Sequence, residues 1–186
     1  AINGLSAYPP LEHHLLPAWI GVGGTPESVL RCAEYGYPII FAIIGGQPRS
    51  FAPLANLYRE AMAKYGHPMQ QMATHSPGHI AETDEEAREE FFPHWLALRN
   101  RLGAERGWGP GSRGEFDAMC TPEGALYVGS PETVAQKILL LKQNLGVDRF
   151  DLKYSSGTLP HKAMMRSIEL FGTVVAPRVA SLLDAA

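Results

Sequence analysis

Apolar residues along the chain alternate between two patterns. Short continuous runs, such as residues 38–44, are typical of strands that are buried on both faces. Between these runs, apolar residues recur at helical spacing, as Leu54, Leu57 and Tyr58 do. Together the patterns predict strands at residues 17–23, 38–44, 69–80 and 149–154. They predict helices at residues 26–35, 51–65, 84 to beyond 98, 134–145 and 161–183.

Turn and capping residues set the limits of these elements. Gly36 and Gly146 follow the last apolar positions of two helices, as C-terminal glycines do. Residues 83–86 (TDEE) form a capping box at the start of a charged helix, and Pro93 predicts a kink or a division within that helix. Residues 76–78 (SPG) interrupt the third strand, and residues 103–114 are predicted to be a loop.

The alternation of strands and helices predicts the fold class. Such an order means parallel pairing with right-handed crossovers, so the chain belongs to the α/β class. Four strands fit either a small doubly wound sheet or half of a (β/α)8 barrel, because a complete barrel needs about 250 residues and this chain has 186. We expect residues 1–16 to form a lead-in segment and residues 17–186 to form a single α/β domain.

One six-residue word occurs twice, as GTPESV at residues 24–29 and as GSPETV at residues 129–134. Each copy predicts a helix start, with Thr25 or Ser130 at the N-cap and proline at the next position. A helix N-terminus also favours anions. A buried run and two glycines precede only the first copy, so we assign a phosphate site to that copy and a cap to the second.

Several segments resemble the luciferase-like flavin monooxygenases, in the order in which that family has them. Residues 19–29 (WIGVGGTPESV) and 37–41 (YPIIF) resemble strand 5, helix 5 and strand 6 of the family's barrel. Residues 81–87 (AETDEEA) resemble the start of its insertion region, and residues 128–135 (VGSPETVA) resemble a late helix start. Residues 165–172 (MRSIELFG) with 175–177 (VAP) resemble its closing helix.

The resemblance implies a fold, a cofactor and an activity. The fold is the C-terminal half of a TIM barrel, with strands 5–8 and an insertion region. The activity is oxidation of a small organic substrate with O2 by a reduced flavin, FMN or alternatively the deazaflavin F420. The half alone is expected to be inactive and to associate as a homo-oligomer or with a partner half-barrel.

Carried over by position, the flavin phosphate contacts fall on Gly24, Thr25 and Ser28, with Gly23 allowing close approach. Glu27 would repel a phosphate unless it points to solvent. Ala42 and Gly45 would line the flavin ring, although the same residues could equally be core and turn. No catalytic residue is identified.

Composition and charge exclude other classes. A net charge of −3 gives no case for binding nucleic acid or an anionic membrane, and no run is long enough to span a bilayer. Cys32 and Cys120 indicate reduced thiols and a cytoplasmic setting. The seven histidines give no metal signature. His75 and His79 flank residues 76–78 at a strand end, where they could face a pocket, but they are interpreted as turn residues.

The roles of some single side chains and the function of the whole chain each leave an alternative open. Lys153 and Tyr154 follow the last strand and could touch substrate, whereas Trp19, Trp95 and Trp108 are interpreted as packing residues. No Ser-His-Asp or Cys-His arrangement supports nucleophilic catalysis. The alternative to a flavin enzyme is a non-enzymatic α/β module that binds a phosphate or a partner protein.

Overall fold

A computed structural model describes residues 3–4, 8 and 17–185 of the chain, so the predicted lead-in lies almost entirely outside the described residues. The described part contains a parallel sheet of five strands. Its strands are β1 (Ile20–Val22), β2 (Ile39–Ala42), β3 (Met72–Ile80), β4 (Tyr127–Gly129) and β5 (Arg149–Lys153). Every pairing is parallel, which confirms the predicted α/β class.

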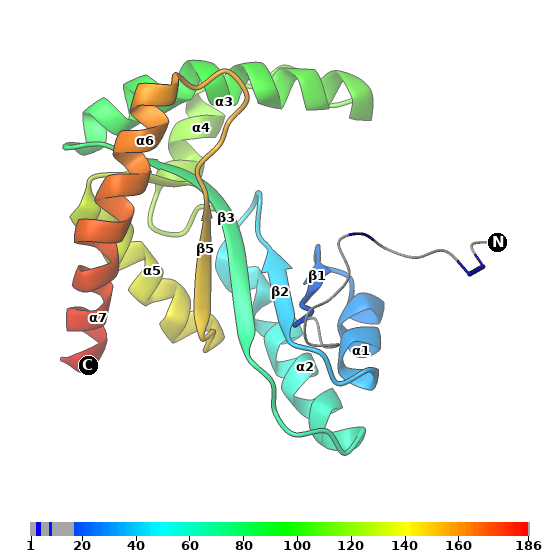
Figure 1. Ribbon diagram of the computed structural model, residues 1–186. Coiled ribbons are helices and arrows are strands. Elements are labelled where there is room, and N and C mark those ends of the chain that lie inside the picture. The colour runs from blue at the N-terminus through cyan, green and yellow to red at the C-terminus, as the bar shows by residue number, and fades with distance from the viewer. Residues whose placement is uncertain (1–2, 5–7, 9–16, 186) are drawn as a thin grey trace.

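Helices alternate with these strands. They are α1 (Pro26–Glu34), α2 (Ala52–Lys64), α3 (Asp84–Arg106), α4 (Arg113–Cys120), α5 (Pro131–Leu145), α6 (His161–Leu170) and α7 (Ala176–Asp184). A short 3-10 turn, η1 (Pro48–Phe51), precedes α2, and a π-helical turn, η2 (Phe171–Val175), joins α6 to α7. Figure 1 shows α3 and α4 lying across the end of the sheet toward which β3 and β5 point.

The helix limits follow the capping chemistry that the sequence predicts. Gly36 and Gly146 end α1 and α5 with φ angles of 68° and 66°, in the left-handed region that favours glycine. The hydroxyl of Thr83 accepts a hydrogen bond of 3.1 Å from the Glu86 N–H, which confirms the predicted cap of α3.

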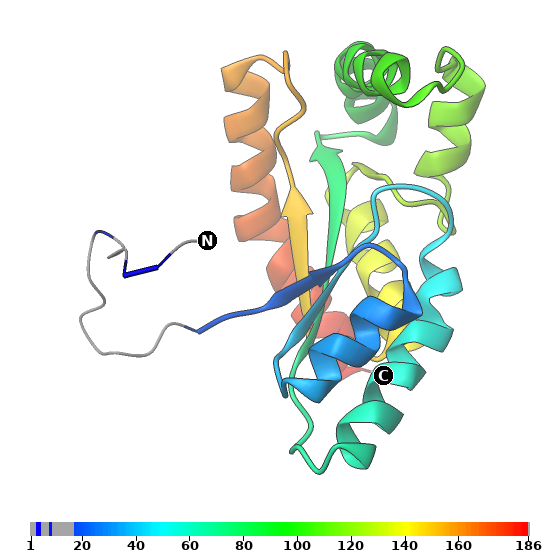
Figure 2. The ribbon, with the colours of Figure 1, turned by 90° about the vertical axis from the view of Figure 1, so that its right-hand side faces the viewer.

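The sheet has a helix-covered face and an inner face. Every second side chain from Ile39 to Ile43 points toward the helices, so Ile39, Phe41 and Ile43 join a core shared with α1, α2 and α5. Figure 2 shows these three helices on the same side of β3. Because paired residues of parallel strands point to the same side, the partially exposed Ala42 and its partner His75 lie on the inner face.

Strand β3 differs from the prediction because it continues through residues 76–78. Pairing with β2 ends near His75, whose carbonyl accepts from the Ile43 N–H at 2.9 Å. Pro77 lies beyond that point, so its missing N–H removes no bond to β2. Gly78 allows the close approach of β4, since a Cβ atom there would lie 2.2 Å from the Tyr127 carbonyl oxygen.

The region after β3 contains more regular structure than predicted. Helix α3 runs without a break past Pro93 and ends at Arg106, so the loop predicted at 103–114 shrinks to residues 107–112. Helix α4 and strand β4 were not predicted. A second core of apolar side chains packs these elements together; it includes Phe91, Trp95, Phe116, Cys120, Leu126 and Val128.

A buried lysine ties the connection between α4 and β4 to α5. The Lys137 ammonium donates hydrogen bonds of 2.6 Å to the carbonyl oxygens of Thr121 and Leu126. Burial lowers the pKa of Lys137 to about 8. These bonds hold the connection in place although it has little regular structure of its own.

Candidate active site at the carboxyl ends of the strands

The first copy of the repeated word begins α1 directly after β1. Gly24 has a φ of 119°, which turns the chain from strand to helix in a conformation that other residues rarely adopt. Thr25 is the N-cap residue, as predicted, but its side chain makes no capping hydrogen bond. Instead, Thr25 Oγ1 donates to Ser28 Oγ at 2.8 Å, which leaves both hydroxyls together at the helix end.

The surroundings of this helix end suit an anion. Thr25 and Glu27 are both exposed, so the Glu27 carboxylate is not held at the helix end by burial. A Cβ atom at Gly24 would lie 3.7 Å from the ring of Phe51. Phe51 packs in turn on Phe41 of β2, with ring centroids 6.0 Å apart. The predicted phosphate loop therefore lies beside the connection that follows β2.

The second copy of the word begins α5, and there the helix end is satisfied from within the protein. Ser130 Oγ accepts from the Thr133 N–H at 3.4 Å, which confirms the predicted cap. The Asp84 carboxylate accepts from the Ser130 N–H at 2.6 Å and from the Thr133 hydroxyl at 2.9 Å. A Cβ atom at Gly129 would lie 2.8 Å from Asp84 Oδ1, so glycine permits this approach.

Electrostatics at the second copy favour the ionised carboxylate. Burial opposes ionisation of Asp84, but the hydrogen bonds from Ser130 and Thr133 outweigh it, and the pKa of Asp84 is lowered. The positive end of the α5 dipole favours the same charge. The Asp84 carboxylate therefore occupies, at the N-terminus of α5, the position that an external anion could take at the N-terminus of α1.

A cavity of about 470 Å³ lies between the strand ends and the insertion region. Its floor comes from the carboxyl ends of the strands and the connections after them: Ile44, Gly45, Gly46, Pro77, Lys153 and Ser156. Its apolar roof comes mainly from α3, through Phe91, Trp95, Leu98 and Leu102. The structure thus places Gly45 and Lys153 in one cavity and places Ala42 on the inner face next to His75.

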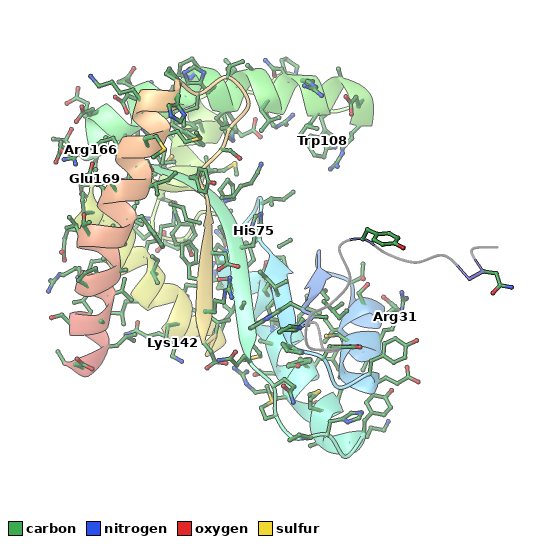
Figure 3. All side chains as sticks on the ribbon, viewed as in Figure 1. Arg31, His75, Trp108, Lys142, Arg166 and Glu169 are labelled. Atoms are coloured by element: carbon green, nitrogen blue, oxygen red, sulfur yellow. The ribbon has the colours of Figure 1, made fainter. Side chains whose placement is uncertain are left out.

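Charged side chains stand along the rim of this cavity. Arg99 Nε lies 2.9 Å from Glu115 Oε1, so these two charges pair. The guanidinium groups of Arg99 and Arg106 lie 4.8 Å and 5.2 Å from the ring centroid of Trp108. Trp108 is 46% exposed, so its prediction as a packing residue is wrong, whereas Trp95 is buried as predicted. Figure 3 shows Trp108 below the projecting end of α3.

Arg99, Arg106 and Glu115 line the cavity but were not predicted as members of the site. Their signal was the spacing along α3, where positions 91, 95, 98, 99, 102 and 106 share one helical face. That face was not assigned to a cavity, because the limits of α3 and the presence of α4 were unknown. Helix α4 supplies Glu115 to the same cavity.

His75 and His79 are strand residues of β3, so their interpretation as turn residues is wrong. His79 is fully buried; its Nε2 lies 2.7 Å from Glu90 Oε2 and its ring stacks on Phe91 at 5.6 Å. His75, labelled in Figure 3, is partially exposed on the inner face, and its partner residue on β5 is Asp151. Of the two, only His75 is placed to meet a ligand.

The described part of the chain offers no support for a metal site, a membrane span or a reactive thiol. There, no group of three His, Cys, Asp or Glu side chains could hold a metal ion. None of the described helices has the length and apolar character to cross a membrane. Cys32 and Cys120 are free and buried, and burial raises the pKa of each thiol to about 11, which disfavours a reactive thiolate.

Comparison with known proteins assigns the family. The model of the family described as luciferase-like monooxygenase matches residues 1–149. The chain belongs to this family. A search of curated proteins gives no match.

Solved structures similar to the chain include a monooxygenase, RslO1 from Streptomyces bottropensis. It has a TM-score of 0.68 and 23% sequence identity over 86% of this chain and 47% of its own. The oxygenating constituent of 3,6-diketocamphane monooxygenase from Pseudomonas putida, in complex with FMN, has a TM-score of 0.64 and 19% sequence identity. The match covers 87% of this chain and 48% of that protein's chain. The coenzyme F420-dependent tetrahydromethanopterin reductase from Methanopyrus kandleri has a TM-score of 0.57 and 18% sequence identity. The match covers 88% of this chain and 51% of that protein's chain.

These comparisons establish the fold. The chain spans about half the length of these three solved structures, and its parallel strands and helices follow theirs over most of its own length. The described fold is therefore a partial (β/α)8 barrel with an insertion region, as the resemblance implied.

Proposed function

We propose that this chain forms the flavin-binding part of an oxidoreductase that oxidises a small organic substrate with O2. The observation that carries the proposal is the N-terminus of α1. It lies at the carboxyl end of a barrel strand, lacks a side-chain cap and brings two hydroxyls within 2.8 Å of each other. A helix N-terminus of this kind favours a phosphate group, since its N–H groups and dipole attract anions and the hydroxyls can donate.

The residues that would hold the flavin phosphate are Gly24, Thr25 and Ser28, with Gly23 leaving room for the ligand. They fit the group, because a Cβ atom at Gly23 would meet nothing within 4 Å and the helix dipole favours an anion. Both hydroxyls can donate to phosphate oxygens. We infer FMN as the cofactor, with F420 as the alternative, since similar proteins carry one or the other in their names.

The flavin would supply the electrons for oxygen chemistry, and the chain's own residues would bind and orient the flavin and the substrate. Ala42 and Gly45 stand at the end of β2 and in the connection after it, where they would contact the ring. The apolar roof from α3 would exclude water from the reacting groups. No described side chain is assigned a catalytic role.

We further expect the 186 residues alone to have little turnover. In the described sheet, β1 pairs only with β2 and β5 pairs only with β3, so each has one strand edge without a partner strand. A second copy or a partner half-barrel would satisfy these edges. A cytoplasmic location is supported by the two cysteines, which form no disulfide with each other.

The test compares FMN with riboflavin, which lacks the phosphate. Wild-type protein should quench FMN fluorescence at lower protein concentration than it quenches riboflavin fluorescence. The double variant Thr25→Ala, Ser28→Ala should bind FMN about 100-fold more weakly, because it loses two hydrogen bonds to a charged group. Riboflavin binding should not change.

A matched control removes two hydroxyls elsewhere. The double variant Thr173→Ala, Ser181→Ala, near the end of the chain, should bind FMN as the wild type does. Equal FMN affinity in the wild type and the Thr25, Ser28 variant would overturn the site assignment. Tight binding of inorganic phosphate with no preference for a flavin would instead support a non-enzymatic phosphate-binding module.

A further inference from the structure

The face of α3 that covers the cavity changes character along its length. Phe91, Trp95, Leu98 and Leu102 form an apolar stripe with helical spacing. Arg99 and Arg106 follow on the same side, two turns apart, at the end where α3 projects beyond the strands (Figure 1). The cavity is thus apolar toward the start of α3 and cationic toward its end.

The opposite wall adds a third cation. Lys153, the last residue of β5, and Ser156 line the cavity from the connection that leaves the sheet. Lys153 is partially exposed and makes no ion pair with any residue whose position is described. Its ammonium is therefore available to a ligand.

The charges that line the cavity do not balance. Glu115 is the one carboxylate among the described lining residues, and Arg99 pairs with it at 2.9 Å. Arg106 stands over Trp108 at 5.2 Å and, like Lys153, has no carboxylate partner within the described part of the chain. Among the described residues, these two cations therefore have no counter-ion, and they lie beside a mostly apolar volume.

We propose that this cavity selects an organic anion with an apolar, ring-sized body, and that Arg106 on one wall and Lys153 on the opposite wall attract its acidic group. The volume of about 470 Å³ lies in the range of small-molecule sites. Trp95 and Leu98 contact the body of the ligand, and Trp108 holds the Arg106 guanidinium at the rim. That this ligand is the substrate of the oxidoreductase rests on the proposed function, whereas its binding in the cavity does not.

The experiment uses 2-naphthoate as the anionic probe and 2-naphthamide as its neutral counterpart. Isothermal titration calorimetry on the full chain should show that naphthoate binds more tightly than naphthamide. Arg106→Gln and Lys153→Gln should each weaken naphthoate binding about tenfold, the size of one charge-assisted hydrogen bond, and leave naphthamide binding unchanged. Arg101→Gln, an exposed arginine of α3 that does not line the cavity, is the matched control and should bind both probes as the wild type does.

FMN titrations on the same variants separate this inference from the proposed function. FMN affinity should be unaffected by Arg106→Gln and Lys153→Gln, and naphthoate affinity should be unaffected by Thr25→Ala with Ser28→Ala. Cation-dependent naphthoate binding without FMN binding would support the cavity's preference while the flavin proposal fails. Equal affinities for naphthoate and naphthamide, or loss of FMN binding in the Arg106 and Lys153 variants, would overturn the inference.

Discussion

The N-termini of α1 and α5 have almost the same six residues but differ in the groups that bond to them. At α5, Ser130 caps the helix and the Asp84 carboxylate lies 2.6 Å from its backbone N–H. At α1, the Thr25 side chain caps no backbone N–H and instead donates to the Ser28 hydroxyl. Residues 24–29 and 129–134 differ only by exchanges of serine and threonine, so the word itself does not explain the difference.

The difference comes from a residue far away in the sequence. Asp84 precedes Ser130 by 46 positions and arrives there because β3 pairs with β4 and leads into α3. A helix N-terminus attracts a negative group, and α5 receives one from its own chain. Glu27 lies in the first turn of α1, but no described carboxylate accepts a hydrogen bond from this helix end, and this leaves the end available to a ligand.

Removing the internal anion should have the largest effect on stability. Asp84→Ala should lower the free energy of unfolding by about 2 kcal/mol, because it leaves a partly buried N–H and a hydroxyl at α5 without their charged acceptor. Urea denaturation followed by circular dichroism measures this loss. Asp117→Ala, which removes an exposed carboxylate paired with Arg113, should cost less than about 0.5 kcal/mol. Equal losses for the two variants would contradict the role given to Asp84.

Placing a carboxylate at the open end should make α1 resemble α5. Gly23→Asp adds a side chain where a Cβ atom meets nothing within 4 Å, so the fold should tolerate it. Its charge should repel the flavin phosphate and weaken FMN binding about tenfold, or about 1.4 kcal/mol. Gly23→Asn, which has nearly the same shape and no charge, is the control. An equal effect of both variants would point to steric hindrance.

Removing the two N-cap hydroxyls singly should separate a cap from a ligand contact. Ser130→Ala should cost about 1 kcal/mol of stability, the usual contribution of an N-cap. Thr25→Ala should leave stability nearly unchanged, because its hydroxyl caps no backbone N–H. Thermal denaturation of both variants without ligand measures the difference, and a similar loss in Thr25→Ala would mean that the helix ends are equivalent.

Acid should reduce the contribution of Asp84. Its pKa is lowered in the folded protein, so the folded state binds fewer protons than the unfolded state near and below pH 4. The stability that ionised Asp84 provides is complete above the unfolded pKa of about 4 and is lost as the pH falls through the folded pKa. Unfolding curves of wild type and Asp84→Asn should therefore converge in acid, and a constant difference would contradict the assignment.

The order of elements could be predicted from the sequence because it depends on local patterns. Four strands, the capping box at Thr83 and the ends of α1 and α5 follow from periodicity and turn chemistry. Strand β4 could not be predicted, since its three residues gain their conformation by pairing with residues 78–80 of β3. Helix α4 follows a glycine-rich stretch, and its stability comes from packing of Phe116 in the second core.

The site could be predicted only where one segment contains it. The loop from Gly23 to Ser28 is continuous, and its glycines and hydroxyls indicate a phosphate site, which stays a prediction here. The cavity is assembled from β3, β5, α3, α4 and the connection after β2, so no local pattern places Arg106 and Lys153 in one cavity. Gly45 was assigned to a pocket through the family resemblance and lines this cavity.

Strand β3 has a consequence for how the molecule unfolds. Its residues 73–77 pair with β5, and its residues 78–80 pair with β4 of the insertion region. One continuous backbone therefore serves both the barrel and the insertion, and neither can lose this strand without the other. Amide protons of β4 and β5 should then exchange with solvent at a common rate set by a single cooperative opening.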